Sequence, residues 1–305
     1  MAFYQQQPFT NPQIPFTGPI QGGLQEGRTI TVIGRVLPDT DRFSVNLQCG
    51  SRSEADIALH INPRYDSGPE YIVTNTYWNS DWGDEENIQQ ALLPMGSPFM
   101  LIVLVTHESY KISVNGNHIM DYKHRIPFNK VDTILVEGKV EIHSIAFQSP
   151  VPEFAYAPGF AVPSLPAPAS LNVPYQTTIN GGLRPGKYIS VQGVINPQAD
   201  RIRINLSHKN GTAFHYNPRF DQNVVVCNNK TMEQWGLEEI SSDMPFHKGQ
   251  NFQVVIACNP EHYSVFVNGQ QVQTFKHRFT QLEEIDFLEV AGDLSLSSVD
   301  ITPNF

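Results

Sequence analysis

The amino-acid sequence predicts an all-β protein made of two antiparallel β-sandwich domains that are joined by a proline-rich linker. Short apolar runs alternate with polar residues at a period of two and end at Gly, Pro or Asn, which is typical of antiparallel strands. No segment keeps a helical period. The same motifs also recur in the same order in the two halves of the chain, which indicates a duplicated domain. A length of 305 residues is sufficient for two domains of ordinary size.

The first clear strand is predicted at residues 43–48, where every second side chain is apolar. The next is predicted at residues 57–64, where Ile57, Leu59 and Ile61 share one face and polar residues share the other. The apolar face of each strand is expected to lie in a core. The polar face of residues 57–64 should then stand on the outer surface of a sheet.

Residues 99–105 and 110–114 are short apolar runs between turn residues and are also predicted to be strands. Asn115-Gly116 follows directly and is a strong signal for a two-residue hairpin turn. Asn268-Gly269 repeats this signal in the second half of the chain, with His277-Arg278 following as His124-Arg125 does in the first half.

Prolines recur between the two repeats, and proline removes ladder donors and fixes φ, so this segment is not expected to be a sheet strand. It is predicted to be a semi-extended linker. The predicted organisation is a tail at residues 1–15, a first domain at 16–148, the linker at 149–172 and a second domain at 173–305.

The composition argues against several classes of partner. A net charge of -10 disfavours nucleic acid and anionic lipid, which need a basic surface. No apolar run reaches the roughly 18–20 residues of a membrane span, and the first residues do not have the pattern of a secretory signal. The sparse cysteines Cys49, Cys227 and Cys258 are expected to be free thiols. The ten histidines lack ligand spacing, so neither a metal site nor another cofactor is predicted.

A set of polar and aromatic residues recurs in register in both repeats. A single such row is more often a solvated sheet face than a site, but its registered recurrence indicates a duplicated binding site. The first copy comprises His60, Asn62, Arg64, Asn75, Trp82 and Glu85, and the second His215, Asn217, Arg219, Asn228, Trp235 and Glu238.

The residue types in this set suit a ligand with several hydroxyl groups. Arg only donates hydrogen bonds, Asn does both, and the role of His depends on its tautomer. Glu85 can accept from a hydroxyl and is expected to hold Arg64 by a two-pronged contact. An exposed Trp82 ring offers a flat apolar platform to a sugar ring. Pro63 removes one ladder donor, which predicts a sheet edge or a bend.

On these motifs the sequence resembles the tandem-repeat galectins, closest to the galectin-nine group, with some likeness to galectin eight. The resemblance spans about residues 16–147 and 173–301. It implies a galectin-type jelly-roll sandwich that binds β-galactosides without a metal and is not an enzyme. It also implies that His60, Asn62 and Arg64 grip galactose, that Asn75 and Glu85 hold its O6 region, and that Trp82 stacks on the ring. The matching residues of the second repeat would have the same roles.

One position departs from the family pattern, which commonly places Arg two residues after the Glu. This chain has Asn87 and Ile240 there, so an altered preference for the sugar next to galactose is expected. Arg42 and Arg201 stand at matching strand positions and are candidates for an extended subsite that contacts acidic groups.

Two other classes of function compete with a lectin. Glu284, Asp286 and Glu289 resemble an E-x-D-x-x-E signature of β-glucan-cleaving enzymes, in which paired carboxylates on one strand face act on the glycosidic bond. That string occurs once, however, and lies far in sequence from the duplicated row. The third reading is a structural or protein-binding sandwich with vestigial sugar sites.

The resemblance implies that the protein is bivalent as a monomer and binds β-galactoside glycans on glycoproteins or glycolipids, including microbial ones. Two sites on one chain would cross-link such glycans, giving agglutination, receptor clustering or immune recognition. Whether the protein also forms higher oligomers is left open. The resemblance also implies a cytoplasmic protein that reaches the cell exterior by an unconventional route. The sites are expected to differ, since Tyr216 replaces Ile61 and Ile240 replaces Asn87.

Overall fold

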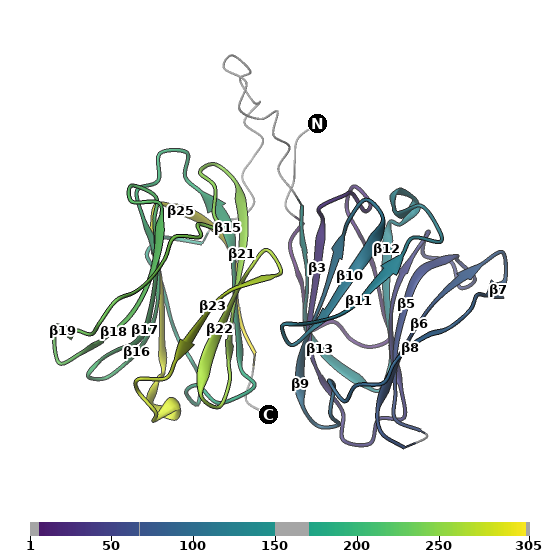
Figure 1. Ribbon diagram of the computed structural model, residues 1–305, viewed down its shortest axis with the longest axis horizontal. Coiled ribbons are helices and arrows are strands. Elements are labelled where there is room, and N and C mark those ends of the chain that lie inside the picture. Colours follow the sequence, from purple (N-terminus) through teal and green to yellow (C-terminus); the bar gives the residue numbers. More distant parts are fainter. Residues whose placement is uncertain (1–5, 67, 150–170, 303–305) are drawn as a thin grey trace, which may run out of the picture. The chain divides into compact units, whose positions relative to one another are not determined.

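The computed structural model describes residues 6–66, 68–149 and 171–302. The chain forms two compact units that divide after residue 150, and each is an antiparallel β-sandwich (Figure 1). The predicted linker lies almost wholly outside the described residues. In each unit we call the sheet that carries the duplicated polar set the site sheet, and its partner the opposite sheet.

The first unit pairs a seven-stranded site sheet with a six-stranded opposite sheet. The site sheet contains β2 (Phe16–Pro19), β12 (Thr133–Gly138), β4 (Phe43–Gln48), β5 (Ile57–Arg64), β6 (Tyr71–Trp78), β7 (Asp81–Trp82) and β8 (Glu86–Ile88). The opposite sheet contains β1 (Phe9–Thr10), β13 (Val140–Gln148), β3 (Thr29–Val36), β9 (Pro98–Val105), β10 (Ser109–Val114) and β11 (Asn117–Lys123). The 3-10 turn η1 (Phe128–Lys130) precedes β12.

The second unit repeats this arrangement strand for strand, except that in its described part β1 is represented only by an isolated bridge between Leu171 and Leu296. Its site sheet contains β14 (Tyr175–Thr178), β24 (Phe287–Gly292), β16 (Ile202–His208), β17 (Gly211–Arg219), β18 (Val224–Thr231), β19 (Gln234–Trp235) and β20 (Glu239–Ser241). Its opposite sheet contains β23 (Gln270–Lys276), β22 (His262–Val267), β21 (Asn251–Cys258), β15 (Tyr188–Ile195) and β25 (Leu294–Ile301), and η3 (Leu282–Glu284) precedes β24.

Each unit has its own hydrophobic core between its two sheets. In the first unit Phe43 of the site sheet stacks on Phe99 of the opposite sheet, with ring centroids 5.6 Å apart. In the second unit Phe214 and Tyr263 make the same kind of contact at 4.9 Å. Burying one such side chain contributes roughly 1.5–3 kcal/mol. The period-two alternation predicted the core faces of residues 43–48 and of Leu59 and Ile61 correctly. It was wrong at Ile57 and Ala58, because the pairing of β5 shifts register between Ile57 and His60, so that Ala58 lies in the core and Ile57 does not.

The hairpin turns are as predicted. Asn115 and Gly116 both have positive φ, at 49° and 84°, as do Asn268 and Gly269, at 50° and 83°. Two successive positive φ values are the geometry of the turn that matches the twist of a two-residue hairpin.

The predicted N-terminal tail, in contrast, is too long. Phe9 and Thr10 pair with β13, opposite Ile145 and Ser144. Gln6 is buried, and its side-chain amide donates to the Pro19 carbonyl and accepts from the Gln21 N–H. Residues 6–15 are thus part of the first sandwich, because their backbone completes the edge of its opposite sheet.

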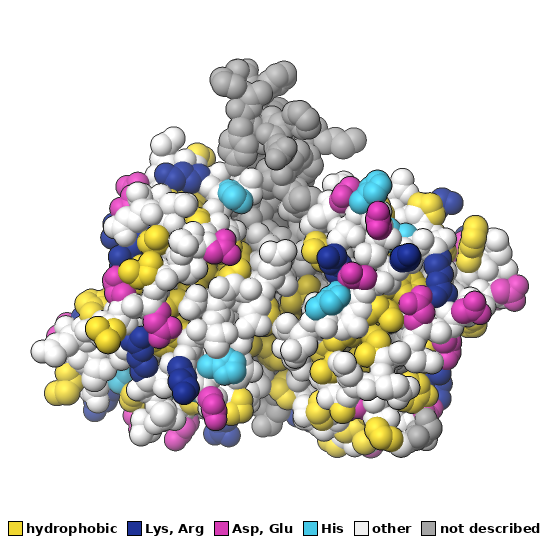
Figure 2. Space-filling view, in the orientation of Figure 1, with side chains coloured by type: hydrophobic (Ala, Val, Ile, Leu, Met, Phe, Trp, Pro, Cys, Tyr) yellow, Lys and Arg dark blue, Asp and Glu magenta, His cyan; other side chains and the backbone are white. Residues whose placement is uncertain are grey.

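Basic and acidic side chains are interspersed on the visible face of each unit (Figure 2). No continuous basic surface is present on that face. Within the described residues, no helix is long and apolar enough to cross a membrane.

Candidate functional site

Each site sheet carries an open pocket that is lined by the complete predicted set of its repeat. His60, Asn62, Arg64, Asn75, Trp82 and Glu85 line the first pocket together with Arg42. His215, Asn217, Arg219, Asn228, Trp235 and Glu238 line the second together with Arg201. The residues come from equivalent strands, β5 to β7 and β17 to β19 with the segments that follow. Asn87 and Ile240 lie on β8 and β20, outside the lining of either pocket.

The histidine of each pocket is held as a neutral ring in one tautomer. His60 Nδ1 lies 2.6 Å from Asn46 Oδ1. An amide oxygen only accepts, so Nδ1 carries the hydrogen and Nε2 keeps its lone pair. Burial and the nearby Arg64 charge lower the pKa of His60 to about 4. The ring is therefore neutral at pH 7 and offers an acceptor to a ligand.

The second pocket has the same arrangement. His215 Nδ1 lies 2.6 Å from Asn205 Oδ1, and burial with the Arg219 charge lowers the pKa of His215 to about 4. Sequence reasoning missed Asn46 and Asn205. Their recurrence at equivalent places on the preceding strand was the available signal.

The proline of the motif explains the orientation of its asparagine. The β4–β5 ladder stops at Val45 and Ile61, and an isolated bridge joins Arg42 to Arg64. Pro63 lies between these two pairs and has no N–H to donate. The carbonyl of Phe43 accepts instead from Asn62 Nδ2, at 2.6 Å.

In the second repeat a side chain replaces the backbone donor in the same way, since Asn217 Nδ2 donates to the Ile202 carbonyl at 2.6 Å. Of the two alternatives predicted at Pro63, a sheet edge or a bend, the edge was wrong, because β5 lies between β4 and β6. The lost donor is replaced by a side chain within the sheet.

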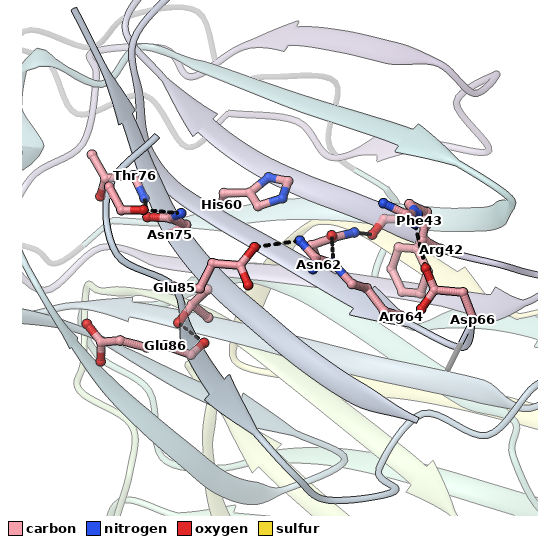
Figure 3. A network of polar contacts seen from close by, with 12 residues as sticks. Arg42, Phe43, His60, Asn62, Arg64, Asp66, Asn75, Thr76, Glu85 and Glu86 are labelled. Carbon is pink, nitrogen blue, oxygen red and sulfur yellow. Dashed lines mark hydrogen bonds and ion pairs between the residues drawn. The ribbon is translucent and has the colours of Figure 1, made fainter. Parts of the chain in front are cut away.

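The guanidinium of each motif is fixed by two different partners. Arg64 Nε donates to Asn62 Oδ1 at 2.8 Å, and Arg64 Nη2 donates to Glu85 Oε1 at 2.9 Å (Figure 3). The predicted two-pronged contact with Glu85 is therefore divided between Asn62 and Glu85. Arg219 has the same two contacts, at 2.8 Å with Asn217 and 2.7 Å with Glu238.

The tryptophan of each pocket presents a half-exposed ring beside the histidine. Trp82 is 51% exposed, and its ring centroid lies 4.8 Å from that of His60. Trp235 is 52% exposed and lies 4.8 Å from His215. An exposed indole face next to hydrogen-bonding groups suits a ring that has one apolar and one polar side.

The two pockets differ at their rims. Leu237 and Ile240 are 85% and 62% exposed in the second unit, where the first unit has Asp84 and Asn87. Tyr216, in contrast, is fully buried in the core. The expectation that Tyr216 distinguishes the sites was wrong, because its side chain points away from the pocket.

The extended-subsite arginines are each paired with an aspartate. Arg42 forms an ion pair with Asp66, and Arg201 Nη2 lies 3.0 Å from Asp221 Oδ2. All four side chains are at least one-third exposed. An acidic ligand group would therefore compete with a carboxylate already present.

The carboxylates of the enzyme signature do not share one strand face. Glu284 lies in η3 and Asp286 precedes β24, so only Glu289 is on the strand. Glu289 Oε1 accepts from Arg203 at 3.0 Å and from Asn205 at 3.2 Å. The string thus lacks the paired geometry expected of a glycosidase. Within the described residues, no group of His, Cys, Asp or Glu could hold a metal ion.

Comparison with known proteins places both units in one family. A family model described as galactoside-binding lectin matches residues 15–147 and 174–301. The chain is 36% identical to galectin-4 of Rattus norvegicus, with 97% of each chain covered, and 33% identical to galectin-8 of Rattus norvegicus, with 95% of each covered. It is 30% identical to a 32 kDa beta-galactoside-binding lectin of Caenorhabditis elegans, with 94% of this chain and 96% of that one covered. The chain therefore belongs to the galactoside-binding lectin family, as a tandem-repeat galectin.

Proposed function

We propose that this β-galactoside-binding lectin holds one galactose in each of its two pockets and cross-links galactose-containing glycans. The observation that carries the proposal is the presence of two complete and geometrically equivalent sets of polar and aromatic groups. The first domain, which begins at residue 6 and ends at residue 148, and the second domain, at residues 173–305, would act as separate binding units on one chain.

In the first pocket His60 Nε2 would accept a hydrogen bond from a sugar hydroxyl. Arg64 would donate from the part of its guanidinium that Asn62 and Glu85 leave open. A hydroxyl both donates and accepts, so it satisfies an acceptor and a donor at once. Asn75 and Glu85 would hold a second hydroxyl, and Trp82 would stack on the apolar face of the ring.

The corresponding residues of the second pocket would have the same roles. Its rim would give it a different preference for the group next to galactose, because Ile240 cannot donate a hydrogen bond. The two sites would thus differ in their preferred glycans, and the chain would be most like the galectin-nine group among tandem-repeat galectins.

Binding at one open pocket is expected to be weak, since the site competes with water and buries little area. Two pockets on one chain then add avidity on dense glycan surfaces. Glycoproteins, glycolipids and microbial glycans with terminal galactosides would be the partners. Agglutination, receptor clustering and immune recognition would follow from cross-linking, without catalysis. The protein would reside in the cytoplasm and would reach the outside of the cell by unconventional secretion.

Titration calorimetry of the full chain with lactose tests the proposal. We expect two sites per chain, one site in either His60→Ala or His215→Ala, and none in the double variant. Maltose serves as the control sugar without galactose. Lactose binding by the double variant, or equal binding of maltose, would contradict the assignment. Release of new reducing ends from a β-glucan would instead support the enzyme alternative.

A further inference from the structure

An arginine that does not line the pocket braces each site from the side. Arg125 follows β11, the edge strand of the opposite sheet in the first unit. Its Nη1 donates to the Asp84 carbonyl at 2.8 Å and to Asn75 Oδ1 at 3.2 Å, and its Nη2 donates to Glu86 Oε1 at 2.7 Å. One guanidinium thus joins the pocket asparagine to the segment after Trp82.

Arg278 makes the same set of contacts in the second unit. Its Nη1 donates to the Leu237 carbonyl at 2.7 Å and to Asn228 Oδ1 at 3.2 Å, and its Nη2 donates to Glu239 at 2.7 Å. It also donates to Asn229 Oδ1, at 2.9 Å.

An aromatic ring supports each guanidinium. Arg125 lies 4.9 Å from the Tyr122 ring centroid, and Arg278 lies 4.7 Å from that of Phe275. A cation over an aromatic face is an attractive contact that restricts where the guanidinium can lie. The recurrence of the whole arrangement in both units argues against an incidental surface contact.

These contacts determine which way the pocket asparagine faces. Asn75 Oδ1 accepts from Arg125 and from the Thr76 N–H, the latter at 2.8 Å. Asn75 Nδ2 donates one hydrogen to the Gly83 carbonyl at 2.8 Å. The orientation of an amide is set by such a network. The second N–H of Asn75 is therefore the group that remains for a ligand.

The glycine after each tryptophan belongs to the same arrangement. A Cβ atom on Gly83 would lie 2.9 Å from Arg125 Nη1, and one on Gly236 would lie 3.1 Å from Arg278 Nη1. Both distances are shorter than ordinary carbon–nitrogen contacts. The glycine after each tryptophan thus leaves space for the guanidinium in its observed place, whereas a larger residue would displace it from the pocket asparagine.

We propose that Arg125 and Arg278 are positioning residues for the two sugar sites. Each presents the asparagine of its pocket as a hydrogen-bond donor and fixes the strand that carries the tryptophan, without touching the sugar. The ligand atom that faces Asn75 or Asn228 is then an acceptor oxygen. This inference rests on the proposed galactoside binding.

The test is a chemical double-mutant cycle on the full chain with its second site inactivated by His215→Ala and Arg219→Ala. Affinities for methyl β-galactoside and its monodeoxy analogues are measured in the parent, in Asn75→Ala and in Arg125→Met. Asn75→Ala identifies the one analogue whose loss of affinity depends on Asn75. We expect Arg125→Met to lower the affinity for methyl β-galactoside about tenfold. In this variant, the analogue that Asn75→Ala identified should lose little further affinity relative to methyl β-galactoside. The relative affinities of the other analogues should be the same as in the parent.

Arg125→Lys should bind more tightly than Arg125→Met but less tightly than the parent. A lysine ammonium can donate to one of the acceptors, but it cannot hold acceptors on two sides at once as the planar guanidinium does. Lys111→Met, on an exposed position of β10, is the matched control and should bind as the parent does. If Arg125→Met does not fold, Glu86→Gln decides, since it keeps Arg125 and weakens only its Nη2 anchor.

Unchanged affinity in Arg125→Met, or an equal loss for every analogue, would overturn the positioning role. Failure of the parent protein to bind any galactoside would instead overturn the proposed function. The two failures are therefore distinguishable within one set of measurements.

Discussion

The Nδ1 atom of His60 lies 2.6 Å from the Oδ1 atom of Asn46, and this contact leaves Nε2 as the nitrogen that faces a ligand. The same distance separates His215 from Asn205. A residue on the neighbouring strand thus decides whether the pocket presents an acceptor or a donor.

Galactoside affinity should depend on pH in a way that an ordinary histidine would not produce. Burial and the nearby arginine lower the pKa of His60 and His215 to about 4. Affinity is therefore expected to stay flat from pH 7.5 to about 5 and to fall as the pH passes through about 4. Lactose titrations across this range check it, and a loss of half the affinity near pH 6.5 would contradict it.

The same shift predicts how folding stability changes with pH. The pKa of each histidine is lower in the folded state than the usual value of about 6.5 in an unfolded chain. The unfolded chain then binds more protons between about pH 6.5 and 4, so stability is lost as the pH falls through this window. The difference in unfolding free energy between the parent and the His60→Gln variant should therefore be constant above about pH 7 and should shift in favour of the variant as the pH falls below about 6, because only the parent loses the contribution of His60. Denaturant unfolding at several pH values measures this, and a difference that does not change with pH would contradict it.

Removing the asparagine behind the histidine should weaken binding although it touches no sugar. Asn46→Leu and Asn205→Leu each delete one hydrogen bond that fixes the tautomer, and a loss of about tenfold in affinity is expected at the affected site. Calorimetry on single-site variants measures it. Equal affinity in the parent and in both variants would show that the tautomer is fixed otherwise.

Glu289→Leu provides a graded comparison. Glu289 holds the amide of Asn205, whereas Leu135 occupies the equivalent register position beside Asn46. We expect a smaller loss at the second site than Asn205→Leu causes, and no change at the first.

Breaking the ion pair at the pocket rim should favour acidic ligands. Asp66→Asn leaves Arg42 without its carboxylate partner, and an exposed pair of this kind is worth little to stability. Affinity for a sulfated lactose should rise several-fold relative to lactose at low salt, and the gain should shrink at high salt. An unchanged ratio would mean that Arg42 does not reach the ligand. Asp221→Asn tests Arg201 in the same way.

Supplying the arginine that this chain lacks should change sugar selectivity. Ile240→Arg introduces a donor on β20 beside the second pocket. The affinity ratio of lactose to methyl β-galactoside is expected to rise several-fold, and Asn87→Arg should act likewise at the first pocket. Leu237→Arg adds the same charge at an exposed position and is the control. A rise of equal size in the control would indicate a general effect of charge.

The strands that carry the pocket could be predicted because their side chains alternate between a core and a surface. Leu59 and Ile61 therefore located the polar face of β5 without a structure, whereas the irregular pairing at Ile57 could not be foreseen from the alternation. The N–H that Asn75 has left for a ligand, and the role of Asn46, could not be predicted. They depend on pairing between strands and on a side chain, Arg125, that reaches across from another sheet.

The edge predicted at Pro63 failed for a related reason. A missing donor was taken as a sign of an unpaired strand, whereas the structure supplies the donor from Asn62. A single sequence records that a backbone donor is absent, but not which side chain replaces it.

Because the side chain of Asn62 replaces the donor that Pro63 lacks, amino-acid changes at these two positions are coupled during evolution. Changing Pro63 first would introduce an N–H that competes with Asn62 for the Phe43 carbonyl, and changing Asn62 first would leave that carbonyl unsatisfied. The loss of Asn62 while Pro63 remains is therefore the costly step, so the asparagine is expected to persist wherever the proline does. The paired residues Asn217 and Pro218 are subject to the same constraint, independently of the first copy.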